Sequence, residues 1–565
     1  MAPPANQPAR APSGSNSVPG KRLLAAWLGI SLVAGLFALP EIDRLGLYYD
    51  EAFLAQQARD FVEPESAGQH PASVRTWDVF GRPFPLRNAV YLGSLKSQLL
   101  IPVLALGGSS PRAVRTATGA LALLALGLSM FWVARIFGEA AAVVMGVLVA
   151  CDPTFYFLAQ FEWGPFTTNF LCRAGGALLI TGAWQSPSRR RSQLAALAGG
   201  ALLGLGVFSR ADFILIPGAA GLALLVCRPD LVREALTERR DLVLAAGAAF
   251  FLAALPMVLS AWALLDSTGA TAGRGGLLFR AQVLWQSLDG SQFLRLIKTG
   301  GLFEKTPGVD APGGLLGWAL IPALLIVSFD LLRPGRRERN PRRDPRAFLL
   351  LFALLLTAFM LALPGAVRAH HQLNTLPLLH LIVACAGLAA WRWKAPGGRS
   401  LLRVPVGLFL AALVAANVLV IRETSAFIAD TGGRGRFSHA LDDFALAIDA
   451  EPGKTVVSLD WGFHEPLLFL TRQTRLVESI WSLPREIAAG RPWVFTGSED
   501  TVYLVHDIPH DLFGLGPALL VAARLAGSEK ARVTPHWDNG GELAFYSVEF
   551  RGPHTLHYDG IFRFR

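Results

Sequence analysis

The sequence predicts a mainly α-helical membrane protein: a polytopic bundle of about eleven to thirteen transmembrane helices, followed by a small extracytoplasmic α/β domain. Three observations support this fold class. Of the 565 residues, 52% are hydrophobic and 17% are charged, whereas soluble domains carry about 25% charged residues. The apolar residues fall in long runs, many of them long enough to cross a bilayer. Arginine is concentrated in the short segments between the runs, as in cytoplasmic loops.

The apolar runs define the expected domains. Residues 1–21 are rich in proline, alanine, serine and glycine, and we expect a disordered cytoplasmic N-terminus. The first run lacks a small-residue cleavage site and is interpreted as a retained helix. The transmembrane domain covers residues 22–421 and includes an outer loop over residues 40–93. Its apolar runs lie near residues 22–39, 94–107, 114–134, 139–158, 165–184, 193–208, 213–227, 242–264, 314–332, 346–363, 373–390 and 401–421.

The positions of the basic residues predict the orientation of the chain. Four basic segments are expected in the cytoplasm, at residues 188–191, 228–240, 333–346 and 391–394. Residues 209–212, 266–313 and 364–372 then lie on the opposite side, with everything after about residue 422. If every run up to residue 184 crossed, Arg189–Arg191 would lie outside. One run between residues 94 and 158 is therefore expected not to cross, and the number of crossings is odd.

Residues 425–565 differ in character from the rest. Short alternating apolar runs at residues 454–459, 501–505 and 543–548 predict strands, and the pattern from His439 to Ala450 predicts a helix. About 140 residues are enough for a core of their own. We expect a small α/β domain on the outer side of the membrane.

Composition and motifs disfavour several functions. The net charge of +10 comes from arginines in loops, so nucleic acid is not an expected partner. The four cysteines lie in or beside apolar runs without metal-ligand spacing, and we interpret them as small buried apolar residues. Neither a phosphate-binding glycine loop after a strand, nor HExxH, nor G-x-S-x-G occurs, so nucleotide hydrolysis has no candidate site.

Acidic residues at the outer ends of apolar runs are the first candidates for chemistry. Asp50 and Glu51 are adjacent in the outer loop, just after the first run. Neighbouring residues of a helix point in different directions, so one acid can face a reacting group while the other holds the local structure. Asp152 and Glu162 lie at two further boundaries, next to Pro153 and Pro165. A solvated loop is the alternative interpretation for the Asp50–Glu51 pair.

Basic residues on the same side are the second set. Lys96 begins an apolar run and is either a phosphate ligand or a lysine that reaches up to the interface. Arg210 lies beside Asp212 and suits a phosphate, a carboxylate or a structural ion pair. Arg368, His370 and His371 open another run. Adjacent histidines do not share a helix face, so a zinc site made from them alone is not expected. Hydrogen bonds to a phosphate or sugar suit them better than a plain interfacial loop.

Together these residues suit a lipid-linked phosphorylated substrate whose tail stays in the bilayer. The cations bind the phosphate, and a carboxylate accepts the proton of an attacking hydroxyl or amine. Phosphate is a good leaving group, so neither a nucleotide nor an activated water is required.

The motifs, taken in order, resemble those of the GT-C class of integral-membrane glycosyltransferases, in the branch of the protein O-mannosyltransferases and the aminoarabinose transferase of lipid A. The resemblance covers approximately residues 22–470. It is carried by Tyr48–Ala52, Tyr91–Lys96 with Pro102, Asp152–Phe155, Phe161–Pro165, Ala369–Gln372 and Leu459–Gly462.

The resemblance implies that a polyprenyl-phosphate sugar donor reacts at the outer face, with inversion, onto a hydroxyl or amine of a lipid, glycan or protein. It implies that Asp50 is the general base and that Glu51 orients the loop or the acceptor. Glu162 stands where the family pattern often has an aspartate, and Lys96 falls where relatives carry a basic group near the donor phosphate. No His/Asp ligand set is visible, so an obligatory divalent metal is not expected. A bacterial inner membrane is the expected location.

Two other functions use the same residues. A transporter or flippase of lipid-linked sugars would bind the substrate without a chemical reaction. Transporters carry charged residues near the bilayer midplane, whereas the charged residues of this sequence lie at the ends of its apolar runs. A non-catalytic membrane scaffold with a binding domain on the outer side is the third hypothesis.

Overall fold

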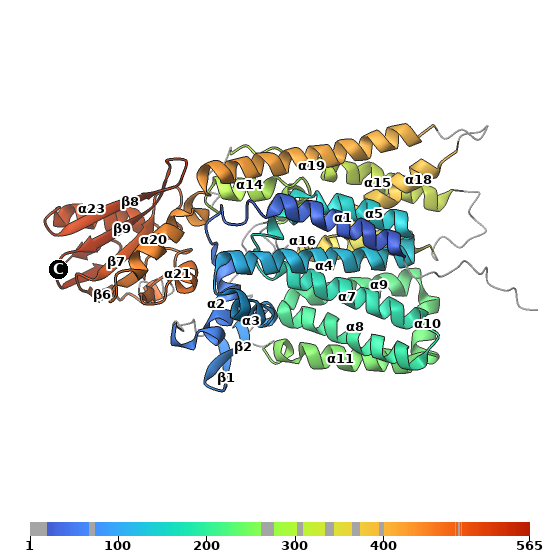
Figure 1. Cartoon of the computed structure of the whole chain (residues 1–565), viewed down its shortest axis with the longest axis horizontal. Helices are drawn as coiled ribbons and strands as arrows, with labels where there is room; N and C mark the ends of the chain where they lie inside the picture. Colours follow the sequence, from blue (N-terminus) through green and yellow to red (C-terminus); the bar gives the residue numbers. More distant parts are fainter. Residues whose placement is uncertain are drawn as a thin grey trace, which may run out of the picture.

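An elongated helical bundle and a C-terminal α/β domain beyond one of its ends make up the molecule (Figure 1). The computed structural model describes residues 20–66, 74–260, 276–301, 309–333, 344–363, 373–394, 401–480, 482–483, 486 and 489–564. The end of the bundle that carries the C-terminal domain is called the outer end below.

The helices of the bundle follow the predicted apolar runs closely. They are α1 (Lys21–Ala38), α3 (Leu95–Gly107), α4 (Pro111–Phe137), α5 (Glu139–Ala150), α7 (Phe166–Gln185), α8 (Arg189–Ser209), α9 (Leu215–Cys227), α11 (Arg240–Val258), α15 (Leu316–Leu332), α16 (Pro345–Ala362), α18 (Leu378–Arg392) and α19 (Arg403–Thr431). The helix α19 continues about ten residues past the predicted end of the transmembrane domain. The run at residues 139–158 is divided, because Asp152 caps a separate short helix, α6 (Pro153–Leu158), whose first residue is proline.

The predicted helical membrane bundle is confirmed. Among the described residues, six helices are long and apolar enough to cross a membrane: α1, α4, α8, α11, α16 and α19. A seventh candidate is a pair bent by 105°, made of η2 (Ala211–Ile214) with α9, and α10 (Pro229–Thr237). The apolar helices α3, α5, α15 and α18 are shorter. The number of crossings, eleven to thirteen, stays a prediction.

Helix α3 is our candidate for the run that does not cross. Its 13 residues span roughly 20 Å, less than the roughly 30 Å of a bilayer core. It packs against α2 (Tyr49–Val62) at the outer end of the bundle (Figure 1). This placement leaves α4 to start at the outer end, which keeps Arg189–Arg191 at the opposite end.

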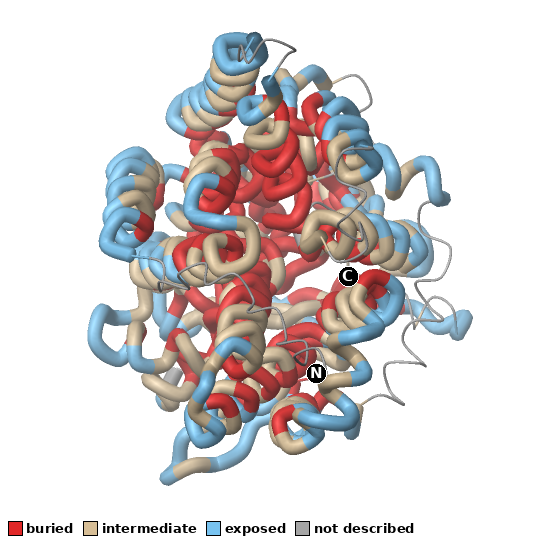
Figure 2. Tube along the Cα trace, turned by 90° about the vertical axis from the view of Figure 1, so that its right-hand side faces the viewer, coloured by how far each residue is buried: buried red, intermediate tan, exposed pale blue. Residues whose placement is uncertain are grey.

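The surface of the bundle is apolar, as lipid contact requires. Viewed along the bundle, buried residues occupy the centre and exposed residues the rim (Figure 2). Large apolar side chains are exposed on α1, including Leu28, Leu32 and Phe37, and on α19, including Leu408 and Leu419. Apolar surface of this extent is not found on soluble monomers. The protein is an integral membrane protein.

The outer loop over residues 40–93 is structured. It contains α2, the short helix η1 (Pro64–Ser66) and an antiparallel sheet of β1 (Arg75–Val79), β2 (Arg82–Ala89) and β3 (Leu92–Gly93). Two more helices, α13 (Leu277–Leu288) and α14 (Ser291–Lys298), precede α15, and η5 (Leu373–Thr375) precedes α18.

The C-terminal domain is the predicted α/β unit. Its main sheet has the order β5-β4-β7-β9-β8, parallel among β5, β4 and β7 and antiparallel beyond. A smaller antiparallel sheet has the order β11-β10-β6. The strands are β4 (Thr455–Ser458), β5 (Arg475–Glu478), β6 (Trp493–Gly497), β7 (Thr501–His506), β8 (Ala531–Trp537), β9 (Leu543–Phe550), β10 (His554–Tyr558) and β11 (Phe562–Phe564), and the helices are η6 (Gly435–Phe437), α20 (Ala440–Asp449), α21 (His464–Leu470) and α23 (Leu515–Ala526).

Helix α2 lies between the bundle and the C-terminal domain. Its alanine face at Ala52, Ala55 and Ala58 packs in one apolar cluster with α3, α4 and Phe469 of α21. The buried Arg59 side chain donates hydrogen bonds to the carbonyl oxygens of Leu468 and Thr471. Both contacts fix α2, and with it the Asp50–Glu51 pair, at the junction of the two domains.

Candidate active site at the outer end of the bundle

The Asp50–Glu51 pair occupies the first turn of α2. Glu51 is the third residue of the helix, and its carboxylate accepts a hydrogen bond of 3.2 Å from the backbone N–H of Tyr48. This contact satisfies one of the donors that a helix N-terminus leaves unpaired. The two acids therefore differ in their surroundings: Glu51 is buried, whereas Asp50 is partly exposed.

Arg115 of α4 holds Glu51 in place. Its Nε and Nη2 atoms each lie 2.9 Å from a different carboxylate oxygen of Glu51, and both side chains are 1% exposed. The remaining donors of Arg115 reach the carbonyl oxygens of Ile42, Leu45 and Gly46 at 2.8–3.0 Å. One arginine thus fixes both the acid and the chain that leads to it.

Asp50 lies near polar side chains of two other segments, one at Tyr91 and one at Arg210–Asp212. The phenol of Tyr91 lies within electrostatic range of Asp50, Arg210 and Asp212. Arg210 and Asp212 form an ion pair of 2.8 Å, which is one of the roles that the sequence left open for Arg210. The segment is attached to the outer sheet, because the N–H of Ala211 donates to the carbonyl oxygen of Tyr91 at 3.1 Å. The phenol of Tyr91 thus lies within electrostatic range of both Asp50 and the Arg210–Asp212 pair.

Lys96 and Glu162 form a buried ion pair. Their Nζ and Oε2 atoms are 2.5 Å apart, and the two side chains are 2% and 3% exposed. Lys96 also donates to the hydroxyls of Thr118 and Thr167, while the other Glu162 oxygen accepts from the backbone and hydroxyl of Thr167. This geometry excludes the interpretation of Lys96 as a side chain that reaches the membrane interface. Its contact with a donor phosphate stays a prediction.

The segment around Glu162 borders the Asp50 loop. The guanidinium of Arg115 lies over the ring of Phe161 at 4.7 Å, and the Trp163 ring centroid is 5.6 Å from that of Tyr48. Tyr48 in turn stacks on Phe437 at 4.4 Å, and Tyr49 contacts Trp461 at 4.5 Å. The fold therefore brings Asp50, Glu51, Lys96, Glu162 and Arg210 to one end of the bundle, under an aromatic layer that the C-terminal domain completes.

Asp152 belongs to a separate pair. One of its oxygens caps α6 by accepting the Phe155 N–H at 2.9 Å, and the other lies 3.1 Å from Nε2 of His380 on α18. Both side chains are 2% exposed. The predicted contact of Asp152 with substrate stays a prediction. In the structure, the residue joins α6 to α18.

Arg368, His370 and His371 lie outside the described residues, so their predicted role in phosphate binding stays a prediction. Within the described residues, no group of three or more His, Cys, Asp or Glu side chains is arranged to hold a metal ion.

Sequence reasoning missed two partners, Arg115 and His380. Each lies within an apolar helix, and each pairs with an acid far away in the sequence. An ionisable residue inside a membrane segment is rare and is by default a candidate for function. That signal identifies both residues, but it does not identify the acid with which each one pairs.

Comparison with known proteins supports the fold. No protein-family model matches the chain, and no curated protein matches it in sequence. The apo structure of ArnT from Cupriavidus metallidurans aligns with a TM-score of 0.52 and 13% identity over 93% of this chain and 98% of that chain. The structure of ArnT bound to undecaprenyl phosphate gives a TM-score of 0.50 and 13% identity over 94% and 98%. The chain therefore shares the fold of ArnT, in agreement with the fold that the resemblance of the sequence motifs implies.

Proposed function

We propose that the protein is a membrane glycosyltransferase that moves a sugar from a polyprenyl-phosphate donor to a hydroxyl or amine acceptor at the outer end of the bundle, with inversion. The observation that carries this proposal is the position of Asp50. It is a partly exposed carboxylate in the first turn of α2, where the bundle, the outer sheet and the C-terminal domain meet. The GT-C fold supports the class of reaction, and the site supports the roles of the residues.

Asp50 is the proposed general base. A carboxylate in the first turn of a helix is stabilised in its ionised form by the helix dipole, and Arg210 adds a positive charge in the same neighbourhood. An ionised acid can accept the proton of the acceptor as its oxygen or nitrogen attacks the sugar. The attack on the face opposite the phosphate inverts the anomeric centre, and the phosphate leaves with the bonding electrons.

Glu51 and Glu162 are proposed to position the base rather than to exchange protons. Glu51 has both carboxylate oxygens bound by Arg115, and Glu162 is held by Lys96 and Thr167. Buried acids in such pairs are poor proton acceptors, because protonation breaks the ion pair. Glu51 fixes the start of α2 beside Asp50, and Glu162 ties the segment that borders this loop to α3. Small errors in the position of a catalytic group are costly.

An apolar groove supports a lipid-linked substrate. It has a volume of about 210 Å³ and lies between α1, α4, α5 and α6, with Ala38, Leu123 and Phe155 among its lining residues. Arg115 lies at this groove but has its donors engaged, so it is not the proposed phosphate ligand. Arg210, Lys96 and the residues Arg368, His370 and His371 remain the proposed phosphate ligands.

Purified protein in detergent, supplied with polyprenyl-phosphate sugars and candidate acceptors, tests the proposal. We expect the wild-type protein to form a glycosidic product and Asp50→Asn to lose at least a hundredfold in rate with an unchanged unfolding temperature. Asp430→Asn is the matched control, because Asp430 is an exposed aspartate near the outer end of α19. Normal transfer by Asp50→Asn would remove Asp50 as base. Movement of the lipid across vesicles without product would favour the flippase.

The same assay with EDTA added tests the prediction that transfer does not require a divalent metal. We expect transfer to continue after EDTA treatment. Loss of activity that added divalent metal restores would show a metal requirement.

A further inference from the structure

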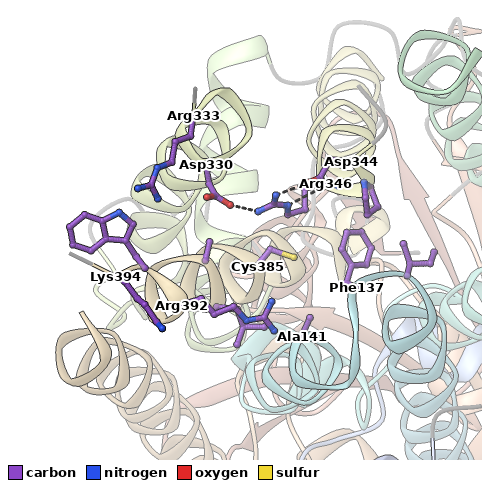
Figure 3. Close-up of a pocket in the computed structure, with 14 residues that line it drawn as sticks. Phe137, Ala141, Asp330, Arg333, Asp344, Arg346, Cys385, Arg392 and Lys394 are labelled. Carbon is purple, nitrogen blue, oxygen red and sulfur yellow. Dashed lines mark hydrogen bonds and ion pairs between the residues drawn. The ribbon is translucent and has the colours of Figure 1, made fainter. Parts of the chain in front are cut away.

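A second cavity lies at the end of the bundle far from the C-terminal domain. Its volume is about 650 Å³, within the range of small-molecule sites. It lies between the ends of α4, α5, α15, α16 and α18 (Figure 3). The residues of the proposed active site do not line it, and the proposed reaction gives it no role.

The charges around this cavity are unbalanced. Its lining includes four basic side chains, Arg333, Arg346, Arg392 and Lys394, and two acidic ones, Asp330 and Asp344. Both acids bind the same partner: Arg346 lies 2.6 Å from Asp330 and 2.6 Å from Asp344. The dashed lines in Figure 3 mark these contacts.

The other three cations are Arg333, Arg392 and Lys394. Within the part of the chain that the structure describes, none of them forms an ion pair with an acidic side chain. All three are exposed at the edge of the cavity. Positive charges gathered at one cavity repel one another, and an anion that binds among them removes this repulsion.

The rest of the lining is apolar. Phe137 lies across the cavity from Arg333 and Lys394 (Figure 3), and Ile136, Leu388 and Ala389 also line the space. A cavity with a cationic edge and an apolar wall matches an amphipathic anion. A soluble anion would leave the apolar wall in contact with water.

The location fits the same chemistry. The four basic lining residues belong to the two arginine-rich segments, residues 333–346 and 391–394, that the sequence predicts in the cytoplasm. Anionic lipids attract basic segments at the cytoplasmic surface of a membrane, and basic pockets between helices bind their head groups.

We propose that this cavity binds an acidic phospholipid of the cytoplasmic leaflet. Its phosphate lies among Arg333, Arg392 and Lys394, and part of an acyl chain lies against Phe137 and Leu388. Arg346 is held by its two acids and shapes the cavity rather than binding the phosphate. The lipid ties the ends of α15 and α18 to the end of α4 and stabilises the bundle. This site is independent of the proposed transfer reaction.

The test uses the full-length protein in detergent, titrated with phosphatidylglycerol, with phosphatidylcholine of the same acyl chains, or with inorganic phosphate. Bound lipid is counted by native mass spectrometry, and the unfolding temperature is followed in parallel. We expect phosphatidylglycerol to bind and to raise the unfolding temperature, and the other two additives to have little effect.

The variant Arg392→Gln/Lys394→Gln should bind phosphatidylglycerol roughly thirtyfold more weakly, because each basic residue near an acidic lipid contributes roughly a fivefold factor. The matched control is Arg190→Gln/Arg191→Gln, which removes two exposed arginines from the start of α8 at the same end of the bundle. Three outcomes would overturn the proposal: equal losses in both double variants, equal binding of phosphatidylcholine, or equal stabilisation by inorganic phosphate.

Discussion

Arg115 binds Glu51 through two hydrogen bonds of 2.9 Å, and both side chains are 1% exposed. The same guanidinium binds the carbonyl oxygens of Ile42, Leu45 and Gly46. A buried arginine therefore fixes the whole approach to α2, and Asp50 immediately precedes Glu51 in this first turn. The position of the proposed base depends on a residue 64 positions away from Glu51.

Replacement of either partner should destabilise the protein. Glu51→Gln leaves the Arg115 charge buried without its anion, at an expected cost of about 3–5 kcal/mol. Arg115→Met should cost more, because it also leaves three buried carbonyl oxygens unpaired. Thermal unfolding in detergent measures both effects. An unfolding temperature of Glu51→Gln within one degree of wild type would contradict this account.

The Lys96–Glu162 pair allows structural and substrate roles to be separated. Lys96→Met leaves Glu162 buried as an unpaired charge and should cost about 3–5 kcal/mol. The double variant Lys96→Met/Glu162→Gln removes both charges and should recover most of this loss, while the amide oxygen can still accept from Thr167.

If Lys96 also binds the donor phosphate, the double variant should regain stability, but its KM for the donor should stay higher than that of the wild-type protein. Unfolding temperature and transfer kinetics, measured on the same preparations, give the two readings. A double variant as unstable as Lys96→Met would show that the pair does not act as a unit.

Asp442 of α20 predicts a pH dependence. It accepts a hydrogen bond of 3.1 Å from the N–H of Leu47, and burial raises its pKa from 3.8 to about 6, against the opposing effects of His439 and Arg115. The folded protein then binds a proton more tightly than the unfolded chain. Stability from this group is present below about pH 4 and is lost as the pH rises to about 6. A shift of about two pKa units corresponds to about 3 kcal/mol.

Asp442→Asn keeps the acceptor oxygen and removes the titration. We expect this variant to unfold at a higher temperature than wild type at pH 8, and the difference to disappear near pH 4. Unfolding curves of the two proteins across this pH range measure the difference. A difference that does not change with pH would contradict the raised pKa.

Gly46 lies at the contact between the outer loop and the C-terminal domain, so its substitution tests how tight this contact is. A methyl group at this position would overlap the carbonyl oxygen of Ser438, and the N–H of Gly46 donates to the carbonyl oxygen of Phe437 at 3.1 Å. Gly46→Ala should therefore push the loop from the domain and cost about 1–3 kcal/mol. Gly35→Ala is the control, because the structure has open space there. Equal unfolding temperatures of the two variants would show that the contact is not tight.

The sequence by itself determined the helices of the bundle, the α/β character of the C-terminal domain and the presence of a helix boundary next to Pro153. These features depend on local information: the length of apolar runs, the two-residue period of strands and the missing N–H of proline. The different roles of Asp50 and Glu51 also followed from local geometry, since adjacent residues in the first turn of a helix face different ways.

Only the tertiary structure decided which charges meet. Glu51 pairs with Arg115, Glu162 with Lys96, and Asp152 with His380, which is 228 positions away. An acid within an apolar protein requires a partner, but the sequence does not say which of several cations supplies it, because that depends on where helices cross. For the same reason, the sequence left Lys96 as either a phosphate ligand or a lysine at the interface, and the packing of α3 against its neighbours places it in a buried pair with Glu162.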